Sequence, residues 1–95
     1  MNFADEATGD VFHGRNSRQA RKIPMDVWES ARRKMDRLNG AVRPEDLKDP
    51  PSNRLEKLKG SLKDFYSIRI NAQFRLVFRF EEGAASEVRI MDYHG

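Results

Sequence analysis

Residues 65–80, FYSIRINAQFRLVFRF, carry the pattern from which the fold of this chain can best be predicted. Their apolar and polar side chains alternate with a period of two, which is the pattern of a strand with one buried face. Residues 65–70 and 74–80 form two such runs. The short connection NAQ between them predicts that the second strand returns antiparallel to the first. The apolar side of this hairpin consists of Tyr66, Ile68, Ile70, Phe74, Leu76, Phe78 and Phe80.

The other side of the predicted hairpin is basic, because it carries Arg69, Arg75 and Arg79 and residues 67–80 contain no acid. Residues that face each other on antiparallel strands lie about 5 Å apart. Guanidinium groups held so close repel one another unless an anion lies between them, and their planar fork suits phosphate. This face therefore predicts contact with a polyanion such as RNA. The alternative is a solvated face on which Glu81 or Glu87 neutralises the arginines.

The segments on either side extend the sheet. EEGAA, residues 81–85, reads as a second turn, and EVRIM after it directs Val88 and Ile90 towards the core. RLEKLKG, residues 54–60, predicts a short strand that ends at Gly60.

The first half of the chain has helical periodicity. Residues 3–14 predict a short helix that stops at Gly14, and residues 24–40 predict a longer one. Pro24 suits the first helical position and Gly40 the residue just past the end. Pro44 predicts a single helical turn, and Pro50 and Pro51 predict extended chain. The apolar stripe of the long helix consists of Val27, Trp28, Ala31, Met35 and Leu38.

Together these elements predict an α+β fold in which two N-terminal helices pack on one face of a small, mainly antiparallel sheet. The length of 95 residues suits one domain, 1–95. The first residues lack the pattern of a signal peptide, and no apolar run is long enough to span a membrane. We therefore expect a cytoplasmic protein with no membrane partner.

Several chemistries lack the residues that they need. The chain has no cysteine, and its two histidines, His13 and His94, are not spaced as ligands of a metal. No glycine-rich phosphate loop is present. We therefore expect no metal and no other cofactor.

The end of the chain places Asp92, Tyr93 and His94 next to one another. Histidine and a neighbouring carboxylate are suited to general acid–base catalysis near neutral pH. Alternation along a strand would, however, direct Asp92 and His94 to one side and Tyr93 to the other. Lys59, just before Gly60, is a further candidate cation. For both features the alternative is an ordinary surface position.

The ordered set PPSNRLEKLKG, YSIRINAQFRLVF and MDYH resembles the HigB-type toxins of the RelE superfamily, as do FADEAT, RQARKIP and ARRKMDRLNGA in the first half. The resemblance implies a ribosome-dependent endoribonuclease that cleaves mRNA on the 70S ribosome without a metal. It implies an antitoxin partner of the helix-turn-helix HigA type, whose complex with the toxin binds operator DNA. It assigns Lys59 and Arg75 to phosphate binding and transition-state stabilisation, and Asp92, Tyr93 and His94 to acid–base catalysis.

We expect Arg69, Asn71 and Arg79 to contact the RNA. Three departures from the pattern bear on activity: Glu56 stands where some members have a histidine, Asn71 where some have an arginine, and GSLKDFYS replaces an acidic, glycine-containing turn. The alternative function is a toxin-fold protein that binds antitoxin and RNA without cleaving. A DNA-binding regulator is a further alternative, but no helix pair with a basic recognition helix is evident.

Overall fold

The computed structural model describes residues 1–93, in which two helices are followed by a sheet of four antiparallel strands in the order β1-β2-β3-β4. The α+β fold expected from the sequence is confirmed. Short 3-10 helices lie in the connections at 20–22, 44–48, 51–53 and 60–62. The main elements are α1 (Glu6–Phe12), α2 (Met25–Gly40), β1 (Glu56–Lys57), β2 (Tyr66–Arg69), β3 (Phe74–Glu81) and β4 (Ala84–Asp92).

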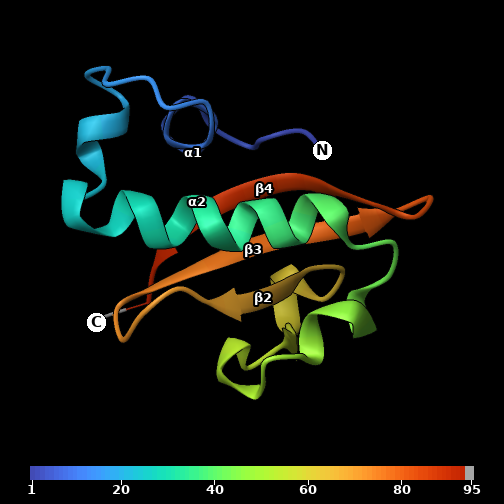
Figure 1. The fold of residues 1–95 in the computed structure, drawn as a ribbon. Coiled ribbons are helices and arrows are strands. Elements are labelled where there is room, and N and C mark those ends of the chain that lie inside the picture. The colour runs from blue at the N-terminus through green and yellow to red at the C-terminus, as the bar shows by residue number, and fades with distance from the viewer. Residues whose placement is uncertain (94–95) are drawn as a thin grey trace.

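Helix α2 lies across one face of the sheet, in front of β3 and β4 in Figure 1. Its apolar stripe is buried as predicted, and the strands contribute Ile68, Leu76 and Phe78 to the same core without any exposure to solvent. Burial of these side chains is the main driving force for packing the helix on the sheet.

Helix α1 and the N-terminal segment are attached to β4, on the same side as α2 (Figure 1). Phe3 forms a parallel bridge with Val88, and the Thr8 hydroxyl accepts a hydrogen bond from the Ile90 N–H at 3.0 Å. Asp5 caps the helix by accepting from the Thr8 N–H at 2.8 Å. These bonds fix the first residues of the chain to the fourth strand.

The β3–β4 hairpin closes through Glu82 and Gly83, both with positive φ (52° and 77°), between the paired residues Glu81 and Ala84. Two consecutive positive φ angles are typical of a type I′ turn, whose twist matches that of the strands. Further along, the pairing shifts register between Val77 and Arg79. Glu87 has a φ of 49° at this bulge, so the two ends of β4 pair in different registers.

Four local expectations need correction. Pro24 is the N-cap of α2 and Gly40 its last residue, so the helix is shifted by one position at each end. The predicted strand at 54–60 is reduced to β1, because Arg54 has a left-handed backbone and Gly60 begins a 3-10 turn. Pro51 likewise begins a 3-10 turn instead of extended chain. Finally, Val77 points to the basic face as predicted but is buried, so that face is only partly open to solvent.

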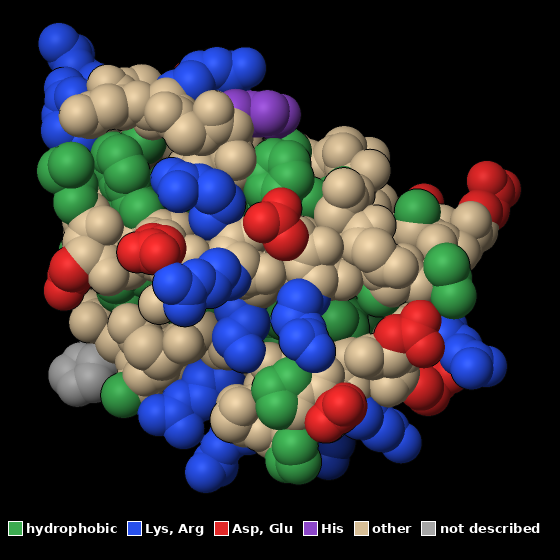
Figure 2. Space-filling model, in the orientation of Figure 1, with side chains coloured by type: hydrophobic (Ala, Val, Ile, Leu, Met, Phe, Trp, Pro, Cys, Tyr) green, Lys and Arg blue, Asp and Glu red, His purple; other side chains and the backbone are tan. Residues whose placement is uncertain are grey.

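Figure 2 shows the helix-covered side of the molecule. Lys and Arg side chains lie over much of this surface and are interspersed with Asp and Glu. Basic residues are therefore not confined to the open face of the sheet, and charge alone does not identify a binding surface. The local arrangement of the charges must decide.

Candidate active site

The open face of the sheet brings Arg69 and Arg75 together, because the two residues are directly paired across β2 and β3. Paired residues of antiparallel strands project from the same face. Glu56, Ser67, Val77 and Arg89 project from this face as well, since they form one row of paired residues across the four strands.

Three arginines line one hollow of about 250 Å³ at the end of this face. We call it the arginine hollow. It lies where the β2–β3 turn meets the end of β4, and no carboxylate is among the described residues that line it. Its lining residues are Arg54, Arg69, Asn71, Ala72, Arg75 and Tyr93. Three guanidiniums outnumber the single carboxylate that the described residues place beside them, that of Glu56, and such an excess of positive charge favours an anion as the ligand.

Arg75 is the most constrained cation of the hollow. Its side chain is only 12% exposed, and its Nη2 donates to the Arg54 carbonyl oxygen at 2.6 Å. Its Nη1 lies 3.4 Å from the Glu56 carboxylate, and its buried Nε has no partner among the described residues. Two neighbours thus hold the guanidinium, yet part of its donor capacity is unused.

Tyr93 lies against this cation, with its ring centroid 5.6 Å from the Arg75 guanidinium carbon. That distance is within the range of a cation–π contact. The Tyr93 N–H donates to the Gln73 carbonyl oxygen at 2.7 Å, which fixes the end of β4 beside the β2–β3 turn. The phenol remains 44% exposed and therefore accessible to a ligand.

Asn71 shapes the turn on which the hollow depends. Its side-chain oxygen accepts from the N–H groups of Gln73 and Phe74, at 2.8 and 2.7 Å. Its carbonyl oxygen accepts from Arg69 Nε at 3.1 Å. The residue expected to contact RNA thus holds the turn and one of the arginines, a role that a short polar side chain suits.

Asp92 lies on the other side of the sheet from Tyr93. It is paired with Phe74, whose side chain belongs to the core, and it borders a hollow that Lys22 and Ile90 also line. Its carboxylate accepts from Gln73 Nε2 at 3.0 Å. The alternation expected for the tail is therefore observed for these two residues. His94, the third residue of that group, lies outside the described residues.

Lys59 and Arg79 are the two remaining predicted site residues, and neither lines the arginine hollow. Lys59 borders a separate shallow hollow formed by residues 57–60, 63 and 64. Arg79 forms ion pairs with Glu81 and Glu87 at 3.2 and 3.3 Å, which is the neutralised alternative considered for the basic face. The bulge at Glu87 places that carboxylate beside it.

Arg54 is the lining residue that the sequence did not single out. It follows Pro50, Pro51 and two polar residues, and nothing in that context distinguishes it from a surface arginine. Its place in the hollow results from a left-handed backbone, with φ 47° and ψ 56°, which few residues with a Cβ adopt.

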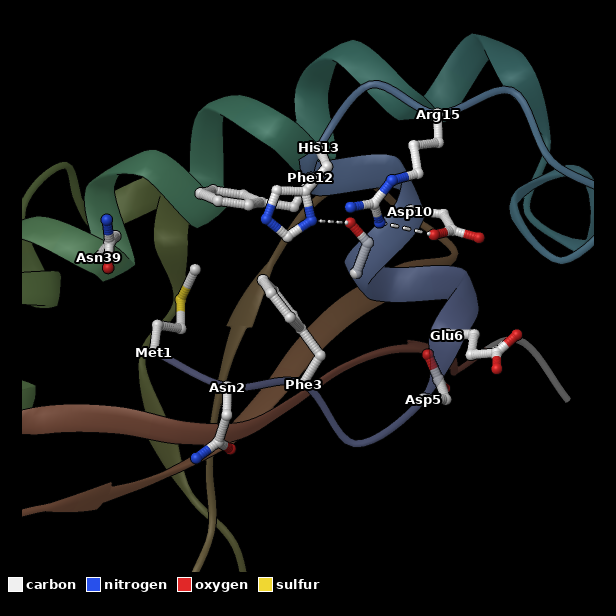
Figure 3. A pocket seen from close by; sticks show the side chains of 11 residues that line it. Met1, Asn2, Phe3, Asp5, Glu6, Asp10, Phe12, His13, Arg15 and Asn39 are labelled. Atoms are coloured by element: carbon white, nitrogen blue, oxygen red, sulfur yellow. Dashed lines mark hydrogen bonds and ion pairs between the residues drawn. The ribbon is translucent and has the colours of Figure 1, made fainter.

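A second hollow, of about 580 Å³, lies between the N-terminal segment, α1 and the end of α2. Figure 3 shows Phe3, Phe12 and His13 turned towards one another there. His13 Nδ1 donates to the Gly9 carbonyl oxygen at 2.8 Å. Three carboxylates, those of Asp5, Glu6 and Asp10, line this hollow and disfavour a phosphate ligand.

Within residues 1–93, no three His, Cys, Asp or Glu side chains come together as ligands of a metal ion. None of the helices in the same range is long and apolar enough to cross a membrane.

Comparison with known proteins gives matches along almost the whole chain. Residues 1–94 match the family model described as a RelE-like toxin of the type II toxin–antitoxin system HigB. The chain is 40% identical over 70 residues to Toxin HigB-1 of Vibrio cholerae serotype O1, which is 74% of each chain. It is 34% identical over 67 residues to an uncharacterized protein of Haemophilus influenzae, covering 70% of this chain and 66% of that one.

Proposed function

Because the chain belongs to the HigB family of RelE-like toxins of type II toxin–antitoxin systems, we propose that it is an endoribonuclease that cleaves mRNA on the ribosome and so inhibits translation. Membership of this family implies an antitoxin partner. The observation that carries the proposed activity is the arginine hollow, where paired Arg69 and Arg75 lie with Arg54 beside an exposed phenol.

The proposed reaction is attack of an RNA 2′-oxygen on the adjacent phosphorus. A bond forms between the 2′-oxygen and phosphorus, and the bond from phosphorus to the 5′-oxygen breaks. A base takes the proton of the 2′-hydroxyl, and an acid gives a proton to the departing 5′-oxygen. The products are a 2′,3′-cyclic phosphate and a 5′-hydroxyl. Negative charge grows on the phosphoryl oxygens in the transition state, and fixed guanidiniums stabilise such charge.

Arg75 is the proposed transition-state cation, because its neighbours hold it in place while each of its two terminal nitrogens keeps a second N–H for a phosphate. Tyr93 and His94 are the proposed proton-transfer residues, and Lys59 is a second proposed cation. Asp92 lies on the opposite face from Tyr93, so we propose that it acts indirectly. It accepts from the side chain of Gln73, whose carbonyl oxygen accepts from Tyr93, and this pair of bonds holds the tail beside the turn.

A toxin-fold protein that binds antitoxin and RNA without cleaving is the second candidate function. The Glu56 carboxylate, 3.4 Å from Arg75 Nη1, favours it, because a carboxylate there competes with a phosphate for the guanidinium. The Asn71 side chain also favours it, because its oxygen is occupied by the turn and it supplies no charge where some members have an arginine.

The test is primer extension on mRNA in purified, programmed ribosomes, with free mRNA as the control. Wild type is compared with Tyr93→Phe, His94→Ala and Arg75→Ala. Arg33→Ala removes an equally charged residue from the exposed side of α2, where it pairs with Glu29, and serves as the matched control. We expect wild type and Arg33→Ala to cut mRNA only when ribosomes are present. The extent of cutting should be lower for Tyr93→Phe, His94→Ala and Arg75→Ala. Ribosome binding without cuts would favour the non-cleaving function.

We further propose that the antitoxin is a HigA-type helix-turn-helix protein, that operator DNA is bound only through the toxin–antitoxin complex, and that the toxin acts in the cytoplasm. Gel shifts of operator DNA with toxin, antitoxin and both together test the second proposal. A shift of operator DNA by the toxin alone would contradict it.

A further inference from the structure

Arg54 occupies an unusual backbone position at the edge of the arginine hollow. Its φ of 47° and ψ of 56° lie in the left-handed region, which residues with a Cβ populate sparsely and which surrounding structure must maintain. Asn53 before it is fully buried; its Nδ2 donates to the Leu47 carbonyl oxygen at 3.1 Å, and its Oδ1 accepts from Lys34. The Arg54 N–H donates to the Pro51 carbonyl oxygen at 3.0 Å.

This conformation gives one residue two contacts with the site. Its carbonyl oxygen accepts the 2.6 Å hydrogen bond from Arg75 Nη2, and its side chain lines the arginine hollow. Within residues 1–93 the Arg54 guanidinium has no hydrogen bond or ion pair, whereas Arg69 and Arg75 each donate to protein oxygens. Arg54, the exposed arginine of the hollow, is therefore the one whose guanidinium donates to no oxygen of the described residues and keeps all of its donors for a ligand.

We propose that Arg54 binds a backbone phosphate of the RNA through its guanidinium and positions Arg75 through its carbonyl oxygen. This inference rests on the proposed endoribonuclease function and adds a substrate-binding residue to it. The physical basis is that arginine forks bind phosphate bidentately and that none of the described residues lining the hollow carries a carboxylate to compete for this cation.

Two substitutions separate the two roles. Arg54→Gly adopts a positive φ freely, so it removes the guanidinium and retains the backbone position of the carbonyl. Arg54→Ala also removes the guanidinium but disfavours that backbone conformation. A difference in cleavage rate between Arg54→Gly and Arg54→Ala therefore reports on the position of the Arg54 carbonyl oxygen. A difference in oligonucleotide affinity between Arg54→Gly and wild type reports on the Arg54 guanidinium.

The first measurement is the affinity for a short single-stranded oligonucleotide with 2′-O-methyl groups, which cannot be cleaved by 2′-oxygen attack. We expect Arg54→Gly to bind roughly five- to tenfold more weakly than wild type, and the slope of log affinity against log salt to become smaller by about 0.7. Arg43→Ala, which removes an exposed arginine paired with Asp46, is the control for net charge. Equal affinities of Arg54→Gly and Arg43→Ala would overturn the phosphate contact.

The second measurement is single-turnover cleavage on saturated ribosomes, well below the melting temperature of each variant. We expect Arg54→Ala to cleave more slowly than Arg54→Gly, because only the alanine variant disturbs the oxygen that holds Arg75. Equal rates would overturn the positioning role. If wild type does not cleave but Arg54→Gly still weakens oligonucleotide binding, the phosphate contact stands and the proposed endoribonuclease function fails.

Discussion

Replacing Glu56 by glutamine removes the carboxylate that lies beside the central cation of the arginine hollow and preserves the size of the side chain. The Glu56 carboxylate lies 3.4 Å from Arg75 Nη1, with side-chain exposures of 58% for the glutamate and 12% for the arginine. An RNA phosphate that approaches Arg75 must compete with this charge. We therefore predict that Glu56→Gln binds RNA more tightly than wild type.

The size of the effect follows from the geometry. Two unit charges 3.4 Å apart attract by about 1 kcal/mol in water and by about 5 kcal/mol at an effective dielectric constant of 20. More than half of the glutamate side chain is exposed, so the water limit is the better guide, and exposed ion pairs rarely exceed about 1 kcal/mol. Since about 1.4 kcal/mol corresponds to a tenfold change in affinity, removing the competitor should tighten binding about fivefold.

The assay is fluorescence anisotropy with the 2′-O-methyl oligonucleotide at physiological ionic strength, repeated at high salt. Glu29→Gln is the matched control, because it makes the same change in net charge, is 74% exposed and pairs with Arg33 on α2 at 2.7 Å, outside the hollow. The gain should be specific to Glu56→Gln and should shrink at high salt. Equal gains in both variants would show a general charge effect, and unchanged or weaker binding by Glu56→Gln would refute the competition.

Three further predictions concern the same site and the stability of the fold. Arg75→Lys keeps the charge but loses the fork, so ribosome-dependent cleavage should slow by about 10²- to 10³-fold in single turnover, and a near-normal rate would remove Arg75 from the transition state. Tyr93→Phe keeps the ring over Arg75, so oligonucleotide affinity should be retained while cleavage falls; equal losses of both would indicate a binding role only. The pKa of Asp46 lies below its ordinary value, chiefly because its carboxylate accepts a hydrogen bond from the Val42 N–H and to a smaller extent because it contacts Arg43. The Asp46 carboxylate therefore stabilises the fold above about pH 4, and this stabilisation is lost as the pH falls further. The melting temperature of wild type should drop more than that of Asp46→Asn in this range. Parallel curves of melting temperature against pH for the two proteins would argue against a contribution of Asp46 to stability.

Local patterns were sufficient for the helices and the hairpin. The stripe from Val27 to Leu38 has the spacing of one helix face, and the alternation from Tyr66 to Phe80 has that of one sheet face. Both faces are buried in the structure. The direction of each side chain in a helix or strand is set by the repeat of that element, about 3.6 residues in a helix and 2 in a strand. Each element could therefore be predicted from its own residues, without knowledge of the elements packed against it.

The composition of the site was only partly predictable. The pairing of Arg69 with Arg75 followed from a short turn between two strands, which fixes register locally. Whether Glu81 or Glu87 neutralises Arg79 stayed open in the sequence, because the second ion pair depends on a bulge that brings Glu87 within 3.3 Å. Arg54 was missed because its role depends on a left-handed backbone that the buried Asn53 and the turn before it maintain.

The fold class, the basic character of one sheet face and the resemblance to a toxin family could all be predicted from the sequence. Periodicity, charge and ordered motifs are properties of the order of residues along the chain. Which cations share a hollow depends instead on the tertiary structure. Arg54, Arg75 and Tyr93 are far apart in sequence, and Arg75 contacts the other two because the sheet brings the segment before β1 and the end of β4 beside it. Register and backbone strain depend on long-range packing, which a local pattern does not contain.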